Sequence, residues 1–81
     1  MAYRYRPEVL DALARHGVRP LEETPPAQIR DHLNDLYRYE IRRLRARLLG
    51  GEFPKQDYVD HVLTLRRRYM LLSMPVAEWT L

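Results

Sequence analysis

The chain has no cysteine, a single lysine and no long apolar run, and each shortage excludes a class of protein. Without cysteine there is no disulfide framework, no thiolate metal site and no cysteine nucleophile. Apolar residues never continue for more than four positions, so we expect no transmembrane segment and no membrane partner. Because the N-terminus also has no apolar signal segment, we expect a cytoplasmic protein.

Signatures of catalysis and metal binding are also missing from the sequence. His16, His32 and His61 show no HxxxH spacing, which disfavours a zinc site. No hydroxyl residue stands in a GxSxG context, and the sequence contains no phosphate loop or dinucleotide fingerprint. We therefore expect no enzyme activity, no catalytic residue, no cofactor and no metal. His16 precedes Gly17 and is expected to cap the end of its own helix.

The composition that remains is that of one small folded domain. Hydrophobic residues make up 46% of the 81 residues and charged residues 31%, which is typical of a globular chain. A chain of this length buries only about 60–65% of the surface that it exposes when unfolded, so its core is thin.

Prolines and glycines divide this domain into helices. Pro7 suits the first turn of a helix, and Gly17 suits a left-handed stop. Thr24 is expected to cap the second helix, which Gly50 and Gly51 end. The pattern predicts a flexible arm over residues 1–6, helices over about 7–16, 25–49 and 54–73, and an apolar tail over 74–81.

The second and third predicted helices are joined by so few residues that we expect a long antiparallel helical hairpin in an all-α fold. Apolar residues of the third helix form two adjacent seams. The first seam consists of Tyr58, Val62, Leu65, Tyr69 and Leu72. The second seam consists of Val59, Leu63, Arg66 and Met70. One partner helix cannot cover both seams, and the first helix is too short to help much, so we expect two hairpins to pair into a dimer resembling a four-helix bundle.

One acidic residue falls inside an apolar stripe. Glu40 lies among the apolar positions of the second helix, and an unpaired buried charge is costly. Folding the hairpin about Gly51 brings Glu40 within about one turn of Arg66. The interpretation we favour is a structural ion pair between Glu40 and Arg66 that sets the hairpin register, and the alternative is a polar pocket that holds a ligand.

Arginine dominates the basic residues, with 13 of the 14 positive charges and a net charge of +3. Such a balance invites a nucleic-acid partner. The candidate polyanion contacts are Arg4, Arg6, Arg38, Arg42 and Arg45. Arg43 and Arg47 instead flank the apolar stripe, so one continuous basic surface is not expected. Acids opposite the arginine clusters are expected to neutralise much of the charge within the hairpin.

These patterns together favour a non-catalytic helical scaffold or adaptor module of a small bacterial type, which forms a homo-oligomer and binds a partner helix. The alternative is a small arginine-rich nucleic-acid-binding protein. A more remote alternative is a small helical dimeric enzyme that binds an anionic substrate.

Overall fold

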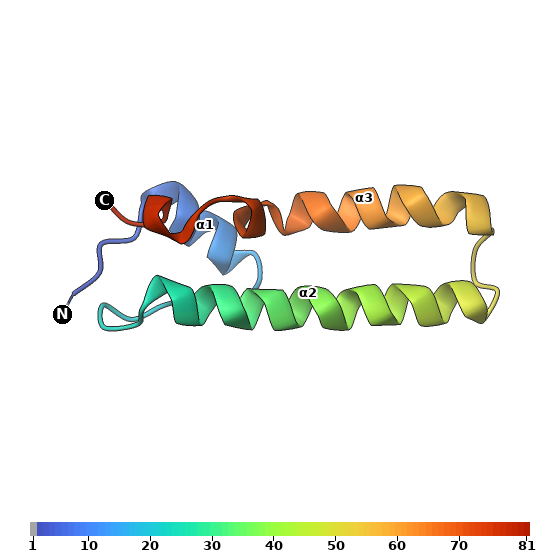
Figure 1. Cartoon of the computed structure of the whole chain (residues 1–81), viewed down its shortest axis with the longest axis horizontal. Coiled ribbons are helices and arrows are strands. Elements are labelled where there is room, and N and C mark those ends of the chain that lie inside the picture. The colour runs from blue at the N-terminus through green and yellow to red at the C-terminus, as the bar shows by residue number, and fades with distance from the viewer. Residues whose placement is uncertain (1) are drawn as a thin grey trace.

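Three α-helices account for most of the molecule, and this confirms the all-α class (Figure 1). The computed structural model describes residues 2–81, with α1 at Pro7–Ala14, α2 at Pro26–Leu49 and α3 at Tyr58–Arg68. Short 3₁₀ turns at Lys55–Asp57, Met70–Ser73 and Val76–Glu78 flank or follow α3. Within residues 2–81 the β-structure is limited to an isolated antiparallel bridge between Tyr5 and Thr80.

The two glycine stops lie where the sequence predicts them. Gly17 has φ 72° and Gly51 has φ 76°, a left-handed conformation that glycine adopts without a steric penalty. Beyond Gly17, the Val18 amide donates to the Leu13 carbonyl at 3.0 Å, and beyond Gly51 the Glu52 amide donates to the Arg47 carbonyl at 3.0 Å. These bonds satisfy carbonyl groups that have no partner inside a helix.

Thr24 does not cap α2. The capping position is Pro25, and α2 begins at Pro26 without a side-chain hydrogen bond. The Thr24 hydroxyl instead accepts a hydrogen bond from the Leu21 amide at 3.1 Å and closes the preceding turn. Pro25 and Pro26 start the helix without a cap because their fixed φ suits its first turn.

The third helix is shorter than the predicted range of 54–73. It ends at Arg68, and Tyr69 leaves the helical region with φ −113° and ψ 35°. His16 supports this break, since its Nε2 lies 2.7 Å from the Arg68 carbonyl oxygen and its ring stacks on Tyr69 at 4.3 Å. A carbonyl only accepts, so Nε2 carries the proton. His16 therefore caps α3. The sequence-based expectation that His16 caps its own helix is wrong.

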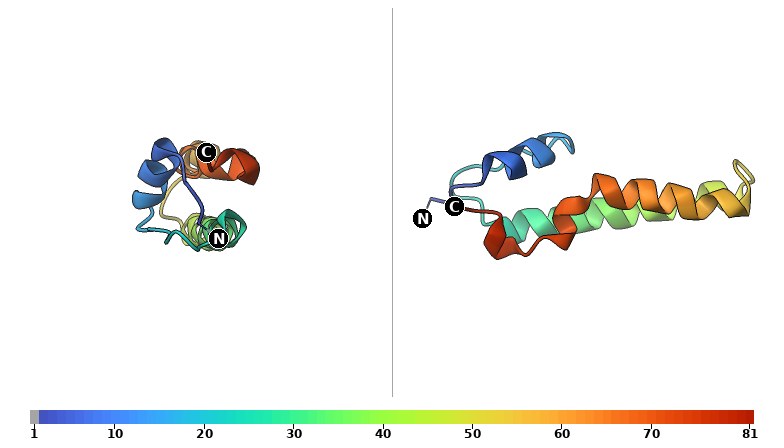
Figure 2. Two further views of the ribbon diagram at one scale, coloured as in Figure 1. Left: turned by 90° about the vertical axis from the view of Figure 1, so that its left-hand side faces the viewer. Right: turned by 90° about the horizontal axis from the view of Figure 1, so that it is seen from above.

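The helices lie in an elongated body of 49 × 17 × 16 Å. Helices α2 and α3 run side by side in opposite directions, and α1 lies on one side of this pair (Figures 1 and 2). The view from above shows that α1 covers only the half of the pair nearest the termini, while the other half extends beyond it (Figure 2). The half that carries the α2–α3 turn is thus left without a third helix.

The core is concentrated in the covered half. Its fully buried side chains are Trp79, Leu13, Leu33 and Val9, of which Trp79 is the largest. Trp79 belongs to the apolar tail, so this tail supplies the centre of the core. Its indole Nε1 donates to the Met74 carbonyl at 3.3 Å, which satisfies the polar end of the ring.

The N-terminal arm is held, contrary to the flexible segment predicted over residues 1–6. Tyr5 is buried and its hydroxyl donates to the Thr24 carbonyl at 2.6 Å. The Arg6 amide donates to the Trp79 carbonyl at 2.9 Å, so the arm pairs with the tail. Met1, the first residue of that predicted arm, lies outside the described residues.

The two seams of the third helix have different surroundings. The first seam is buried or half-buried along its whole length, at Tyr58, Val62, Leu65, Tyr69 and Leu72. The second seam is exposed throughout: Val59 is 61% exposed, Leu63 43% and Met70 65%, and Arg66 is also exposed. One helical pair therefore satisfies the first seam and leaves the second without cover.

Candidate functional site

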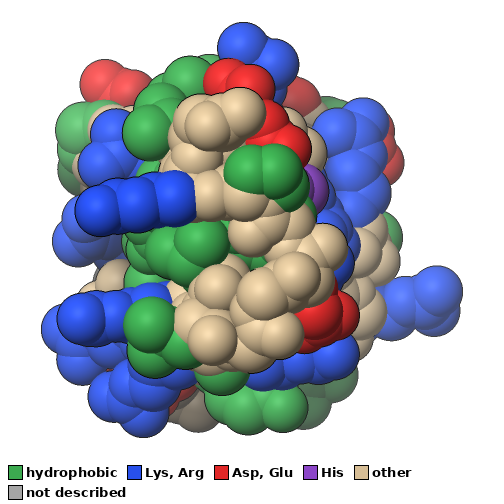
Figure 3. Space-filling view, turned by 90° about the vertical axis from the view of Figure 1, so that its right-hand side faces the viewer, with side chains coloured by type: hydrophobic (Ala, Val, Ile, Leu, Met, Phe, Trp, Pro, Cys, Tyr) green, Lys and Arg blue, Asp and Glu red, His purple; other side chains and the backbone are tan. Residues whose placement is uncertain are grey.

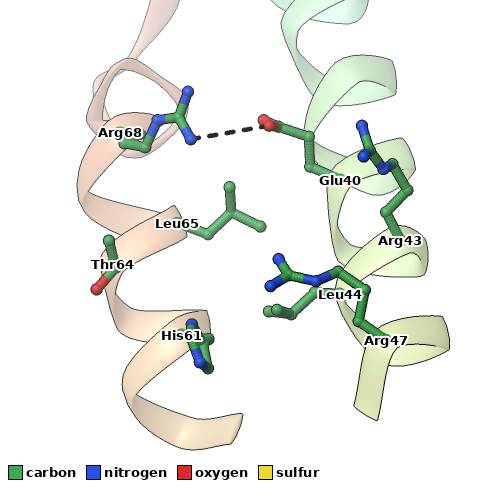
Figure 4. A pocket seen from close by; sticks show the side chains of 8 residues that line it. All are labelled: Glu40, Arg43, Leu44, Arg47, His61, Thr64, Leu65 and Arg68. Carbon is green, nitrogen blue, oxygen red and sulfur yellow. Dashed lines mark ion pairs between the residues drawn. The ribbon is translucent and has the colours of Figure 1, made fainter. Parts of the chain in front are cut away.

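A groove with a volume of about 260 Å³ lies between α2 and α3 (Figure 4). We call it the arginine groove. Its lining residues are Glu40, Arg43, Leu44 and Arg47 from α2 and His61, Thr64, Leu65 and Arg68 from α3. Helix α1 ends beside Arg68, because His16 contacts the Arg68 carbonyl, so the groove lies beyond the end of α1.

The spacing of the lining residues explains why they meet. Arg43 and Arg47 are four positions apart, which places them on one face of α2. His61, Thr64 and Arg68 are separated by three and four positions and share a face of α3. Two leucines between these rows, Leu44 and Leu65, are both buried. The groove therefore has cationic rims above an apolar floor.

Glu40 pairs with Arg68 and not with Arg66, so the predicted ion pair has the wrong partner. Glu40 Oε1 lies 3.9 Å from Arg68 Nη1 (Figure 4). Arg66 is exposed and lines a separate shallow hollow of about 300 Å³ together with Tyr37 and Tyr69. The spacing places Arg66 in the second seam, whereas Arg68 belongs to the face that borders the arginine groove.

The other carboxylate oxygen of Glu40 is in an unusual position. Oε2 is buried and has no hydrogen-bond partner in the described part of the chain. The same carboxylate influences Tyr69. Burial, and secondly the neighbouring Glu40, raise the pKa of Tyr69 from 10.0 to about 12. The phenol of Tyr69 and the charge of Glu40 are thus coupled.

Aromatic contacts close the groove at the α2–α3 turn. The Phe53 ring lies 4.3 Å from the His61 ring, with an angle of 42° between their planes. The Arg47 guanidinium carbon lies 5.6 Å from the centre of the Phe53 ring, within the range of a cation–π contact. Arg47 Nε also lies 3.5 Å from Glu52 Oε1, but both of these side chains are about half exposed, so the ion pair is weak.

The candidate polyanion contacts do not come together on one surface. Arg38, Arg42 and Arg45 are exposed on α2, and Arg4 is exposed near the termini. The Arg6 Nε donates to the Glu78 carbonyl at 2.8 Å and is held by the tail. Viewed from the turn end, basic side chains occur on both sides of the molecule (Figure 3).

Few direct ion pairs account for the neutralisation of the arginines that the sequence predicts within the hairpin. Between Ala2 and Leu81 the ion pairs within 4.0 Å are those of Arg47 with Glu52 and of Arg68 with Glu40. The acids opposite the arginine clusters do not reach them at this distance. Most of the cationic side chains are therefore left to solvent or to ligands.

In the described chain no group of three or more His, Asp or Glu residues is placed to hold a metal ion. None of the described helices is both long enough and apolar enough to cross a membrane. The chain matches no protein-family model, no curated protein and no solved structure. The sequence offered a polar ligand pocket beside Glu40 and Arg66 only as an alternative. It did not place Arg43, Arg47 and Arg68 there, although Arg43 and Arg47 beside the apolar stripe were a signal for the arginine groove.

Proposed function

We propose that the protein is a non-catalytic helical interaction module that pairs with a second copy of itself through the second seam of α3. The observation that carries this proposal is the exposure of the whole seam. Three of its members are apolar: Val59 and Leu63 lie one turn apart on α3, and Met70 lies in the 3₁₀ turn that follows α3.

The seam is compatible with antiparallel self-pairing because its residues are arranged symmetrically. Val59 and Met70 are equally far from the point midway between residues 64 and 65, and so are Leu63 and Arg66. A two-fold axis at that point sets Leu63 of one copy opposite Arg66 of the other, both on α3, and brings Val59 near Met70 in the 3₁₀ turn just beyond α3. Asp60 of the second copy then lies within one turn of Arg66 and provides an opposite charge.

The size of the seam sets the strength of the dimer. Helix α3 has 11 residues and is therefore about 16 Å long. A helix of this length cannot by itself bury the roughly 1,200 Å² or more that a specific interface of standard size buries. We therefore expect a weak dimer of two hairpins, with α2 and α3 of each copy forming a four-helix arrangement, that dissociates on dilution.

Sedimentation velocity over a range of protein concentrations tests this proposal. The expected mass rises from that of the 9.8 kDa monomer toward twice that value, with little dependence on salt. The variant Leu63→Arg sets a like charge opposite Arg66 of the second copy, so it is expected to remain monomeric while its circular dichroism stays helical. Leu21→Arg is the matched control, because Leu21 is an exposed leucine outside α3. Equal effects of the two variants, or a monomer at the highest concentration, contradict the proposal.

The second candidate function is nucleic-acid binding through α2. Arg38, Arg42 and Arg45 are exposed and have no ion pair within 4.0 Å among the described residues, and Tyr39 is exposed between them. Binding of this kind weakens steeply as salt increases, because it depends on counterion release. Co-purified nucleic acid that is removed by salt favours this function, whereas self-association that is indifferent to salt favours the first.

A further inference from the structure

We infer that the arginine groove is a binding site for a small phosphate monoester. This site lies on a different face of α3 from the second seam, so it is independent of self-association. The argument rests on the charge of the groove, its shape and the position of Glu40.

The net positive charge of the groove favours a dianionic ligand. Among the lining residues, Arg43, Arg47 and Arg68 contribute three positive charges and Glu40 one negative charge, which leaves an excess of two; Glu52 lies outside the lining and forms only a half-exposed pair with Arg47. Three guanidinium groups around one groove repel each other unless an anion lies among them. A phosphate monoester carries a charge of about −1.5 to −2 at pH 7 and balances this excess, whereas a single carboxylate balances only half of it.

The groove also has the donors and the dielectric that favour phosphate. Guanidinium groups bind phosphate oxygens in a two-pronged geometry, and here they come from two helices and can approach from two sides (Figure 4). The Thr64 hydroxyl and the His61 ring add donors on the α3 side. The two leucines of the floor are buried whereas the three arginines are exposed, so the lower dielectric strengthens charge-assisted bonds on the floor side of the groove only.

The size of the groove favours a small ligand. At one end α1 stops beside Arg68, where His16 contacts the Arg68 carbonyl. At the other end Phe53 packs on His61 next to the α2–α3 turn. The groove itself has a volume of about 260 Å³, which suits a small molecule, and Thr64 and Arg68 also line a second hollow that continues toward α1.

Glu40 does not prevent anion binding. Its Oε1 lies 3.9 Å from Arg68 Nη1 and its Oε2 is buried, so the carboxylate occupies the Arg68 end of the groove and leaves the part between Arg47 and His61 to an anion (Figure 4). The long 3.9 Å contact keeps Arg68 beside α2 without saturating its donors. Glu40 is therefore a positioning residue for Arg68.

Titration with inorganic phosphate and with glycerol 3-phosphate, followed by amide NMR shifts, tests the inference. We expect saturable shifts centred on residues 40–47 and 61–68, and weaker or no saturation with acetate at the same ionic strength. The titration is repeated on the Leu63→Arg variant, whose substituted position lies on the face of α3 away from the groove, so that a failure of self-association does not affect the result. Absence of saturable binding by both phosphate compounds overturns the inference.

Two arginine variants decide whether binding belongs to the groove. Arg47→Gln removes a groove cation and is expected to weaken phosphate binding at least about tenfold, the effect of one charge-assisted contact. Arg45→Gln removes the same charge from an exposed position of α2 outside the groove and is expected to change affinity by less than about threefold. Equal losses in both variants indicate a diffuse attraction to the charged surface and overturn the assignment of the site.

Discussion

Replacement of Trp79 by alanine is expected to destabilise the protein severely. Trp79 is 0% exposed and is the largest of the fully buried side chains, although it lies only two residues from the end of the chain. Its carbonyl accepts the Arg6 amide, so the indole and the backbone around it join the tail to the arm and to the core.

The magnitude follows from the burial. Truncation of a buried tryptophan to alanine costs about 3–5 kcal/mol, because apolar contacts are lost and a cavity remains. The indole hydrogen bond to the Met74 carbonyl is lost as well. A domain of 81 residues has a total stability of about 4–12 kcal/mol at typical values per residue. The Trp79→Ala substitution therefore removes a large share of the stability, or all of it.

Urea denaturation followed by circular dichroism measures this effect, since the variant has no tryptophan for fluorescence. Leu81→Ala is the control in the same tail, because Leu81 is 75% exposed and its truncation is expected to cost less than about 0.5 kcal/mol. A Trp79→Ala variant within about 1 kcal/mol of the parent protein would refute the position of the indole at the centre of the core.

Three further predictions concern the contacts between the helices. His16→Ala is expected to lower the free energy of unfolding by about 1–2 kcal/mol, because the hydrogen bond to the Arg68 carbonyl and the stacking on Tyr69 are lost. His32→Ala is the control at an exposed position and should change this free energy by less than about 0.5 kcal/mol in the same urea experiment. Because folding raises the pKa of Tyr69, the neutral phenol contributes fully to the free energy of unfolding below pH 10, and about 2 kcal/mol of that free energy is lost as the pH rises toward 12. Urea titrations at alkaline pH should show a smaller loss of stability for Tyr69→Phe, and an equal loss in both proteins contradicts the assignment. Glu40→Gln is expected to lower the pKa of Tyr69, which the absorbance of the phenolate measures, and an unchanged pKa shows that the carboxylate does not act on Tyr69. The same variant should change the free energy of unfolding by less than about 1 kcal/mol, because the ion pair with Arg68 is long and partly exposed.

The parts of the fold that depend on local chemistry could be predicted from the sequence. Gly17 and Gly51 end helices because glycine accepts a positive φ, and the prolines start helices because their φ is already fixed. The first seam could be predicted from its spacing alone, because a single apolar face of α3 is enough to define which side packs on a neighbour. In each of these cases a short stretch of sequence contains all the information needed.

Features that depend on distant contacts could not be predicted. The end of α3 at Arg68 has no glycine or proline beside it, and it is supported by His16, which lies 52 residues away. The pairing of Tyr5 with Thr80 uses backbone groups, which leave no pattern in the side chains. The burial of Tyr5 and Trp79 was indicated only by the presence of large aromatic residues in both terminal segments.

The candidate site was predicted in part. The sequence placed Glu40 correctly in the hairpin interior, but it selected Arg66 where the structure has Arg68. The two arginines are two positions apart and therefore lie on different sides of α3. The rotation of one helix against the other is set by packing along the whole pair, and for this reason spacing alone could not decide between them.

Cross-linking with introduced cysteines tests the proposed self-association most directly, because the chain has no cysteine of its own. Antiparallel pairing through the second seam predicts that a mixture of Val59→Cys and Met70→Cys variants is joined by a short thiol-specific cross-linker. Each variant alone should not be joined, since equivalent residues lie about 16 Å apart along the helix axis. No cross-linked dimer in the mixture, or equal cross-linking of Val59→Cys with itself, would contradict pairing through this seam.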